Sequence, residues 1–294
     1  MDKIICPHFI CIGPTRTGTT WLYETFRKHP QVWLPPVKEL KYVGEGTVIP
    51  AYSLQQLTLS GHWHYREMRS LPFRMLGKVL LGRENLENLA WALRYSLRPG
   101  ASEFSFEWYS ALFTNRKHQL SGDISPIYYH LPESRVSELS QHSHQTKVLV
   151  FVRNPIERVW STALKALAAN NKRDPDDVTR DEFISHFDYA HRQWPSYESV
   201  IDLWKRNFPQ VFVGRFDDLQ ENPQLFFRDV CDFFGVNADV PIDQVDRRVN
   251  KGLAKKMPVD LAKYLRNQYF DEINRLAELG YCKNPAAWLG VADE

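Results

Sequence analysis

Apolar runs alternate with amphipathic stretches along the chain. The runs at 9–12, 147–152 and 211–213 have the continuous hydrophobicity of strands buried on both faces of a parallel sheet. A shorter run at 32–34 predicts a further strand, and helical apolar spacing follows each of the three longer runs. The sequence therefore predicts an α/β fold, a P-loop-type doubly wound parallel sheet flanked by helices with right-handed crossovers.

Capping residues mark where several of these helices begin and end. Asn154 and Asn222 each precede a proline, so each is expected to cap a helix whose first position is that proline. Glu157, three residues after Asn154, has the position of a capping-box acid. Gly235 is expected to end the helix that follows Asn222, and a last long helix is predicted from about 259 to 279.

The stretch at about 52–116 is mostly helical and has no clear parallel-strand signal, so we interpret it as a substrate-binding insertion in a single domain spanning 1–294. A basic run could bind an acidic group, but such a run is more often a solvated helix face, which we favour. It consists of His62, His64, Arg66, Arg69 and Arg74. An aromatic set is interpreted in the same way as core or cleft wall: Trp91, Tyr95, Trp108 and Tyr109.

The loop at 13–22, with the sequence GPTRTGTTWL, follows the first strand and opens a helix. Backbone N–H groups and the helix dipole make such a turn an anion cradle. The spacing of Gly13 and Gly18 is that of a nucleotide P-loop, but Thr19 stands where a Walker motif has lysine, and Arg16 supplies the cation instead. The loop therefore favours a phosphate that is bound differently from that of ATP.

Composition narrows the classes of function. The formal net charge of +2 argues against a nucleic-acid binder that relies on bulk charge. The four cysteines have neither CxxC nor metal-ligand spacing, so we expect buried thiols, no metal and a reducing, cytoplasmic location. No run approaches a membrane span, and the anion loop begins too close to Met1 for a cleaved signal peptide.

A second phosphate motif follows the strand at 147–152. Arg153 stands at the carboxyl end of that strand, where open α/β sheets bind ligands, and Ser161 lies two helical turns after the Asn154 cap. The two side chains could converge on one phosphate. The alternative is an arginine paired with a neighbouring carboxylate and a serine on a solvated face.

Together the two motifs call for a ligand with two separated phosphates, and here the chain resembles the sulfotransferases that use 3′-phosphoadenosine-5′-phosphosulfate (PAPS). The stretches that carry the resemblance are IGPTRTGTTWLYETFRKHP, KELKY, GDISPIYY, VFVRNPIERVWS and VGRFDDLQENP. The order and spacing of these stretches, taken together, are specific to this family. The resemblance covers residues from about 52 to 102 and from 170 to 195 poorly. The resemblance implies PAPS as cosubstrate, and we expect no metal because the anion cradle and Arg16 supply the positive charge.

The resemblance also implies which residues bind PAPS. The backbone of the loop would hold the 5′-phosphate through Thr15, Thr17, Gly18, Thr19 and Thr20. Arg16 takes the place often held by a lysine that contacts the bridging oxygen, and Arg153 and Ser161 would bind the 3′-phosphate. Lys251 and Gly252 resemble the late loop that closes over the nucleotide, and Tyr197 would lie near the adenine.

The transfer needs a base for the proton of the acceptor. Glu39 matches the catalytic carboxylate of the heparan-sulfate-like branch, and its alternative is a surface acid in a charged loop. Asp123 is the second candidate, with Ser125 and Tyr128 near it, and His130 is a third that is more often structural. Ile124 departs from the related branch, which often has lysine there.

The function predicted from these features is sulfuryl transfer from PAPS to a hydroxyl or amine by in-line displacement, releasing adenosine 3′,5′-bisphosphate. The acceptor would be a small molecule, a lipid-linked intermediate or a saccharide. Two alternatives stay open, a P-loop kinase and a nucleotide-binding protein that has lost catalysis. Dimerisation is compatible with the sequence, although no motif demonstrates it.

Overall fold

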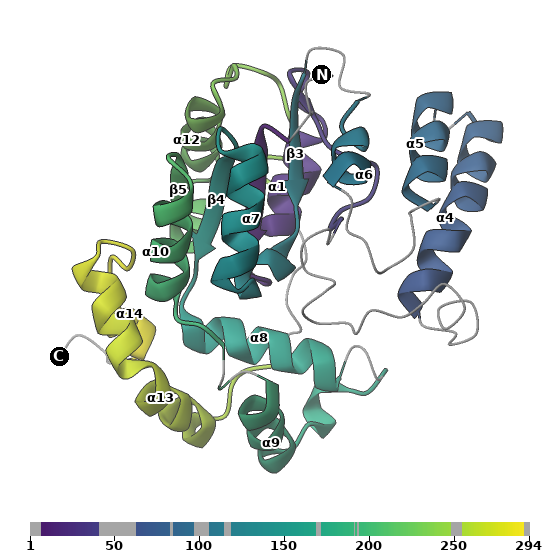
Figure 1. Ribbon diagram of the computed structural model, residues 1–294. Coiled ribbons are helices and arrows are strands. Elements are labelled where there is room, and N and C mark those ends of the chain that lie inside the picture. The colour runs from purple at the N-terminus through teal and green to yellow at the C-terminus, as the bar shows by residue number, and fades with distance from the viewer. Residues whose placement is uncertain are drawn as a thin grey trace.

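A five-stranded, all-parallel sheet lies at the centre of the fold (Figure 1). The computed structural model describes residues 7–40, 63–82, 85–96, 106–114, 119–168, 172–190, 192, 194–247 and 255–290. In the order β2-β3-β1-β4-β5 the strands are β1 (Phe9–Gly13), β2 (Val32–Trp33), β3 (Leu120–Ile124), β4 (Lys147–Val152) and β5 (Val211–Arg215). The predicted α/β class with a parallel sheet is confirmed, and β1 occupies the centre.

Helices cover both faces of the sheet (Figure 1). Alternate residues of β1 and β4 point to opposite faces, as the period of a strand requires. One face packs with α7 (Glu133–Ser143), α8 (Pro155–Leu167) and α10 (Tyr197–Asn207) through Ile10, Ile12, Val148, Val150 and Val152. The other face of the sheet packs with α1 (Thr19–Phe26) and α12 (Pro223–Phe234) through Phe9, Cys11, Leu149 and Phe151.

β3 is missing from the strands that the sequence predicts, because its sequence LSGDI lacks an apolar run. Ser121, Gly122 and Asp123 are nevertheless buried in the sheet beside β1. A Cβ on Gly122 would lie 2.1 Å from the ring of Phe9. Glycine is therefore required there, because the Phe9 ring packs directly over the neighbouring strand.

The predicted helix boundaries hold well. The Asn154 side chain accepts a hydrogen bond from the backbone N–H of Ile156 at the start of α8, and Asn222 does the same for Leu225 in α12. Gly235, at φ 78°, ends α12 in the left-handed conformation. The last long helix, α13, runs over Val259–Glu278.

Further elements are present in the described part of the chain. They are α4 (Trp63–Leu80), α5 (Leu86–Ser96), α6 (Phe106–Ala111), η1 (Pro126–His130), η3 (Pro175–Asp177), α9 (Arg180–Ala190), α11 (Phe216–Glu221) and α14 (Pro285–Leu289). The described part of 52–116 is helical, and Figure 1 shows α4 and α5 to one side of the sheet. Trp91, Tyr95 and Tyr109 are buried there, which confirms their assignment to the core, whereas the side chain of Trp108 lies outside the described residues. Among the described residues, no helix has both the length and the apolar character needed to cross a bilayer.

Candidate active site

The loop between β1 and α1 has an unusual backbone. Gly13, Arg16 and Gly18 all have positive φ, at 89°, 67° and 96°. A Cβ on Gly13 would lie 2.8 Å from Pro126, and one on Gly18 would lie 2.7 Å from Leu219. Both glycines are therefore needed where η1 and α11 approach the loop.

This loop closes on itself and presents the start of a helix. The Thr17 hydroxyl donates to the Pro14 carbonyl at 2.7 Å, and α1 begins at Thr19 without an acidic residue in its first turn. The positive end of the helix dipole is therefore uncompensated within α1. Such a helix start attracts an anion.

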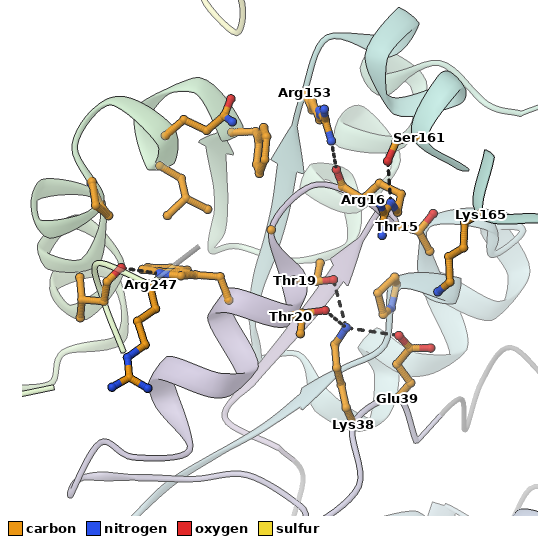
Figure 2. Close-up of a pocket in the computed structure, with 18 of the residues that line it drawn as sticks. Thr15, Arg16, Thr19, Thr20, Lys38, Glu39, Arg153, Ser161, Lys165 and Arg247 are labelled. Carbon is orange, nitrogen blue, oxygen red and sulfur yellow. Dashed lines mark hydrogen bonds and ion pairs between the residues drawn. The ribbon is translucent and has the colours of Figure 1, made fainter. Parts of the chain in front are cut away.

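Arg16, Arg153 and Ser161 come together at one side of the loop (Figure 2). Nε of Arg16 donates to Oγ of Ser161 at 2.7 Å, and Nη1 of Arg153 donates to the Arg16 carbonyl at 2.9 Å. Burial lowers the pKa of Arg16, and the nearby Arg153 lowers it further. The positive charge of Arg153 is thus close enough to act on the Arg16 guanidinium, and the two cations together favour bound anions.

Arg153 has further contacts that hold it at the end of β4. Its Nη2 donates to the Glu157 carboxylate at 2.8 Å, and its guanidinium lies 4.7 Å from the centre of the Phe216 ring. Glu157, which the sequence assigns to a capping box, thus pairs with Arg153. Nε of Arg153 is buried and has no hydrogen-bond partner among the described residues. It can therefore still donate to a ligand.

Lys38 and Glu39 lie on the other side of the loop, just after β2 (Figure 2). Nζ of Lys38 donates to the hydroxyl of Thr20 at 3.1 Å and contacts the Glu39 carboxylate at 3.3 Å. Glu39 has φ 67° and its N–H donates to the Ile124 carbonyl at 3.2 Å, so β3 fixes its backbone. The Glu39 side chain remains one-third exposed.

These groups surround one cavity of about 600 Å³, a volume suited to a nucleotide-sized ligand. The charged residues in its wall are five cations and two carboxylates, which leaves an excess of three positive charges: Arg16, Lys38, Arg153, Lys165 and Arg247 against Glu39 and Asp246. Apolar side chains, among them Trp21 and Phe216, form part of the wall. The arrangement can bind a polyanion that carries a planar aromatic ring.

The chain matches the family description "Sulfotransferase domain" over residues 6–273. It belongs to the sulfotransferase domain family. The fold agrees with that of a sulfotransferase from Alicyclobacillus acidocaldarius at 19% identity, with a TM-score of 0.64 and coverage of 97% of this chain and 99% of the other. A sulfotransferase domain from the curacin biosynthetic pathway is similar at 14% identity and a TM-score of 0.50, with coverage of 94% and 99%. No curated protein sequence gives a significant match.

Most of the binding residues expected from the sequence line the cavity of this sulfotransferase. Those at the wall are Thr15, Arg16, Gly18, Thr19, Thr20, Glu39, Arg153 and Ser161. Thr17 is fully buried inside the loop. Lys251 and Gly252 lie outside the described residues, as do His62 and the side chains of His64, Arg66 and Arg69. Arg74 is exposed on α4.

Asp123 is not part of the cavity wall. It is fully buried, and its carboxylate accepts hydrogen bonds from Ser125 at 2.7 Å, Tyr128 at 2.8 Å and Tyr109 at 3.0 Å. Burial raises its pKa, and these donors together with the backbone of Leu40 offset part of that rise. A carboxylate with so many donors is suited to hold the Glu39–Leu40 segment rather than to take a proton from an acceptor.

Tyr197 and His130 also lie away from the cavity. The Tyr197 ring is fully buried, its hydroxyl accepts the Arg153 N–H at 3.3 Å, and the ring packs under the Arg158 guanidinium. His130 packs against Trp194, and burial, with a contribution from Arg158, lowers its pKa to about 4. Among the described residues, no group of three or more metal-ligating side chains is present.

The sequence did not single out Lys38, Lys165 or Arg247 as site residues. Lys165 lies one helical turn after Ser161 and so on the same face of α8, a signal that was available. Lys38 directly precedes Glu39, but only the fold places it against Thr20. Arg247 follows α12 by a loop of irregular structure, and its position has no signature in the sequence.

Proposed function

We propose that this sulfotransferase uses PAPS and transfers its sulfuryl group in line to a hydroxyl or amine. The observation that carries the proposal is a single cavity with a helix-start anion loop, two adjacent guanidinium groups, and a Lys38–Glu39 pair in its wall. A ligand with phosphates at two positions of one ribose fits this distribution of charge.

In the proposed binding mode, the backbone N–H groups of Thr17 to Thr20 hold the 5′-phosphate at the start of α1. Arg153 and Ser161 bind the 3′-phosphate, and the unpartnered Nε of Arg153 supports this role. We place the adenine against Phe216, which lines the cavity and is only partly buried. We place Lys251 and Gly252 over the nucleotide by resemblance, and we withdraw the adenine role from Tyr197 because its ring is fully buried.

We assign the role of base to Glu39. Its carboxylate accepts the proton of the acceptor as the acceptor oxygen or nitrogen forms a bond to sulfur, while the bond from sulfur to the bridging oxygen breaks. The electron pair of that bond goes to the departing 5′-phosphate. Arg16 and Lys38 offset the negative charge that develops there.

Arg16 and Lys38 offset the charge on the departing phosphate in different ways. Arg16 uses its Nε for Ser161, so its two Nη groups are available to the phosphosulfate; neither is hydrogen-bonded to a described residue. A guanidinium acts as a fixed charge because it does not release its proton, whereas the Lys38 ammonium contacts both the loop hydroxyls and Glu39. We therefore propose that Lys38 supplies the second cation that Ile124 does not.

Asp123 has a positioning role in this scheme. Its hydrogen bonds to Tyr109, Ser125 and Tyr128 hold β3 and the segment after Glu39 in place. The acceptor stays undefined beyond its class, a small molecule, a lipid-linked intermediate or a saccharide. We also retain the single domain of 1–294, and a reducing location, since Cys11, Cys231 and Cys282 are free and buried.

Two experiments test the proposal. Calorimetry should show binding of adenosine 3′,5′-bisphosphate that does not need Mg²⁺, and weaker binding of ATP. Mass spectrometry of cell extract treated with the enzyme and PAPS should show a metabolite that has gained one sulfuryl group. Tight ATP binding only in the presence of Mg²⁺ would instead favour the kinase alternative, and binding without transfer would favour a protein that has lost catalysis.

A further inference from the structure

Exposed apolar side chains gather on one part of the molecule. Among the described residues, six of the eleven large exposed hydrophobic side chains fall between 73 and 93: Phe73, Leu76, Leu80, Leu81, Leu86 and Leu93. The other five are spread over α9, α12 and α13, with one of them directly after the end of α13. Single exposed apolar residues are ordinary, but a cluster of this kind marks an interaction surface.

The cluster belongs to the hairpin of α4 and α5, which Figure 1 shows to one side of the sheet. Leu71 and Met75 of α4 are buried, whereas Phe73 and Leu80 are 77% and 78% exposed. The spacing of Phe73, Leu76 and Leu80 puts them on one face of α4, opposite Leu71 and Met75. One face of α4 therefore packs into the core while the other presents an apolar strip outward.

Basic residues accompany the strip. The exposed residues Arg74 and Lys78 lie on α4 between the strip and the buried face. Over 70–82 and 85–96, three cations (Arg74, Lys78 and Arg94) stand against one carboxylate, Glu87. Apolar side chains beside cations on a helix surface suit an interface of acyl chains and anionic headgroups.

We propose that this strip, Phe73, Leu76 and Leu80 with the neighbouring Arg74 and Lys78, docks the protein on the surface of an anionic lipid bilayer. The helix lies in the plane of the interface and does not span it. A second copy of the chain fits less well, because a symmetric contact through this strip would bring the Arg74 and Lys78 cations of the two copies together. The proposal is independent of the nucleotide site.

Sedimentation with vesicles tests the proposal. The full chain is mixed with vesicles of phosphatidylcholine alone, or of phosphatidylcholine and phosphatidylglycerol in equal parts, at fixed low salt. We expect the protein to pellet with the anionic vesicles, and added salt to weaken this binding. The variant Arg74→Gln/Lys78→Gln should lower the partition coefficient on anionic vesicles on the order of tenfold or more.

The contribution of the apolar side chains is tested with Phe73→Gln/Leu80→Gln. This variant should also reduce binding to anionic vesicles at least about tenfold, because two side chains that would insert into the bilayer surface are lost. The matched control is Tyr189→Gln/Val259→Gln, since these side chains are 90% and 87% exposed elsewhere, and it should bind as the wild type does. Thermal unfolding shows that each variant is folded.

Three results would overturn the proposal. The first is that the wild type does not bind anionic vesicles, and the second is that both the Arg74/Lys78 and the Phe73/Leu80 variants bind as tightly as the wild type does. The third is a control variant that loses as much vesicle binding as these two variants lose. A wild-type dimer that Phe73→Gln/Leu80→Gln converts to a monomer, without vesicle binding, would assign the strip to a second copy instead. None of these results bears on whether adenosine 3′,5′-bisphosphate binds, so the proposed function is tested separately.

Discussion

Replacement of Arg153 by glutamine tests whether the cavity holds a second phosphate. Arg153 lies in the cavity wall, and its buried Nε has no hydrogen-bond partner among the described residues. A hydrogen bond to a charged group contributes about 1.5–3 kcal/mol, so losing one or two from the 3′-phosphate should weaken binding on the order of 100-fold. The ion pair with the exposed Glu157 adds little to stability, so the variant should fold.

The assay compares two ligands by calorimetry at one salt concentration. Adenosine 3′,5′-bisphosphate offers both phosphates, whereas adenosine 5′-phosphate offers only the one assigned to the loop. Wild type should bind the first more tightly, and Arg153→Gln should remove most of that difference. Because Arg153 also donates to the Arg16 carbonyl in the loop, the affinity for adenosine 5′-phosphate should fall as well, but by about tenfold at most.

A matched control is available on the neighbouring strand. Arg215 ends β5, pairs with Asp218 at 2.6 Å and is not in the cavity wall, so Arg215→Gln should leave both affinities unchanged. The assignment of Arg153 to the 3′-phosphate is refuted if Arg153→Gln weakens the binding of both ligands equally, or the binding of neither. Equal loss in Arg153→Gln and Arg215→Gln would point to a general effect of surface charge.

Three further predictions concern single residues. Glu39→Gln should lower kcat about a hundredfold to ten-thousandfold with unchanged affinity for adenosine 3′,5′-bisphosphate, and an unchanged kcat would exclude Glu39 as the base. Gly18→Ala should cost about 1–3 kcal/mol of unfolding free energy in a denaturant titration, because φ is 96° and the new Cβ meets Leu219 at 2.7 Å; a neutral effect would contradict this. His130 has a folded pKa of about 4 against 6.5 normally, so its contribution to stability is present above pH 6.5 and is lost as the pH falls toward 4. The melting temperature of His130→Gln should therefore fall less than that of the wild type between pH 6.5 and pH 4. A changed pH profile of sulfuryl transfer in this variant would instead support His130 as the base.

Much of the nucleotide side of the site could be predicted from the sequence, because it depends on local structure. The order of strand, glycine-bounded loop and helix start is written in consecutive residues, and the Asn154 cap fixes the direction in which Ser161 faces. Arg153 and Ser161 were expected near one another, whereas Arg16 was assigned to the separate 5′-phosphate motif. In the fold Arg16 is hydrogen-bonded to both of them. Arg153 pairs with Glu157, as the alternative interpretation expected, and it also lines the cavity, where phosphate binding is our proposal.

Residues that depend on the packing of distant segments could not be found in this way. β3 is buried with polar residues because Asp123 receives three hydroxyl donors, one of them from α6, and no local pattern reveals those partners. For the same reason Asp123 was the second candidate for the base from the sequence, although it is not part of the cavity wall. Lys38 reaches Thr20 only because β2 ends beside the start of α1.

The central claim, sulfuryl transfer from PAPS, is tested most directly by following both products of one reaction. The protein is incubated with PAPS carrying radioactive sulfur and with cell extract, and the labelled metabolite and adenosine 3′,5′-bisphosphate are quantified together. We predict that the two form in equal amounts and that Glu39→Gln slows both to the same extent. Formation of neither product, in a protein that also fails to bind adenosine 3′,5′-bisphosphate, would contradict the claim.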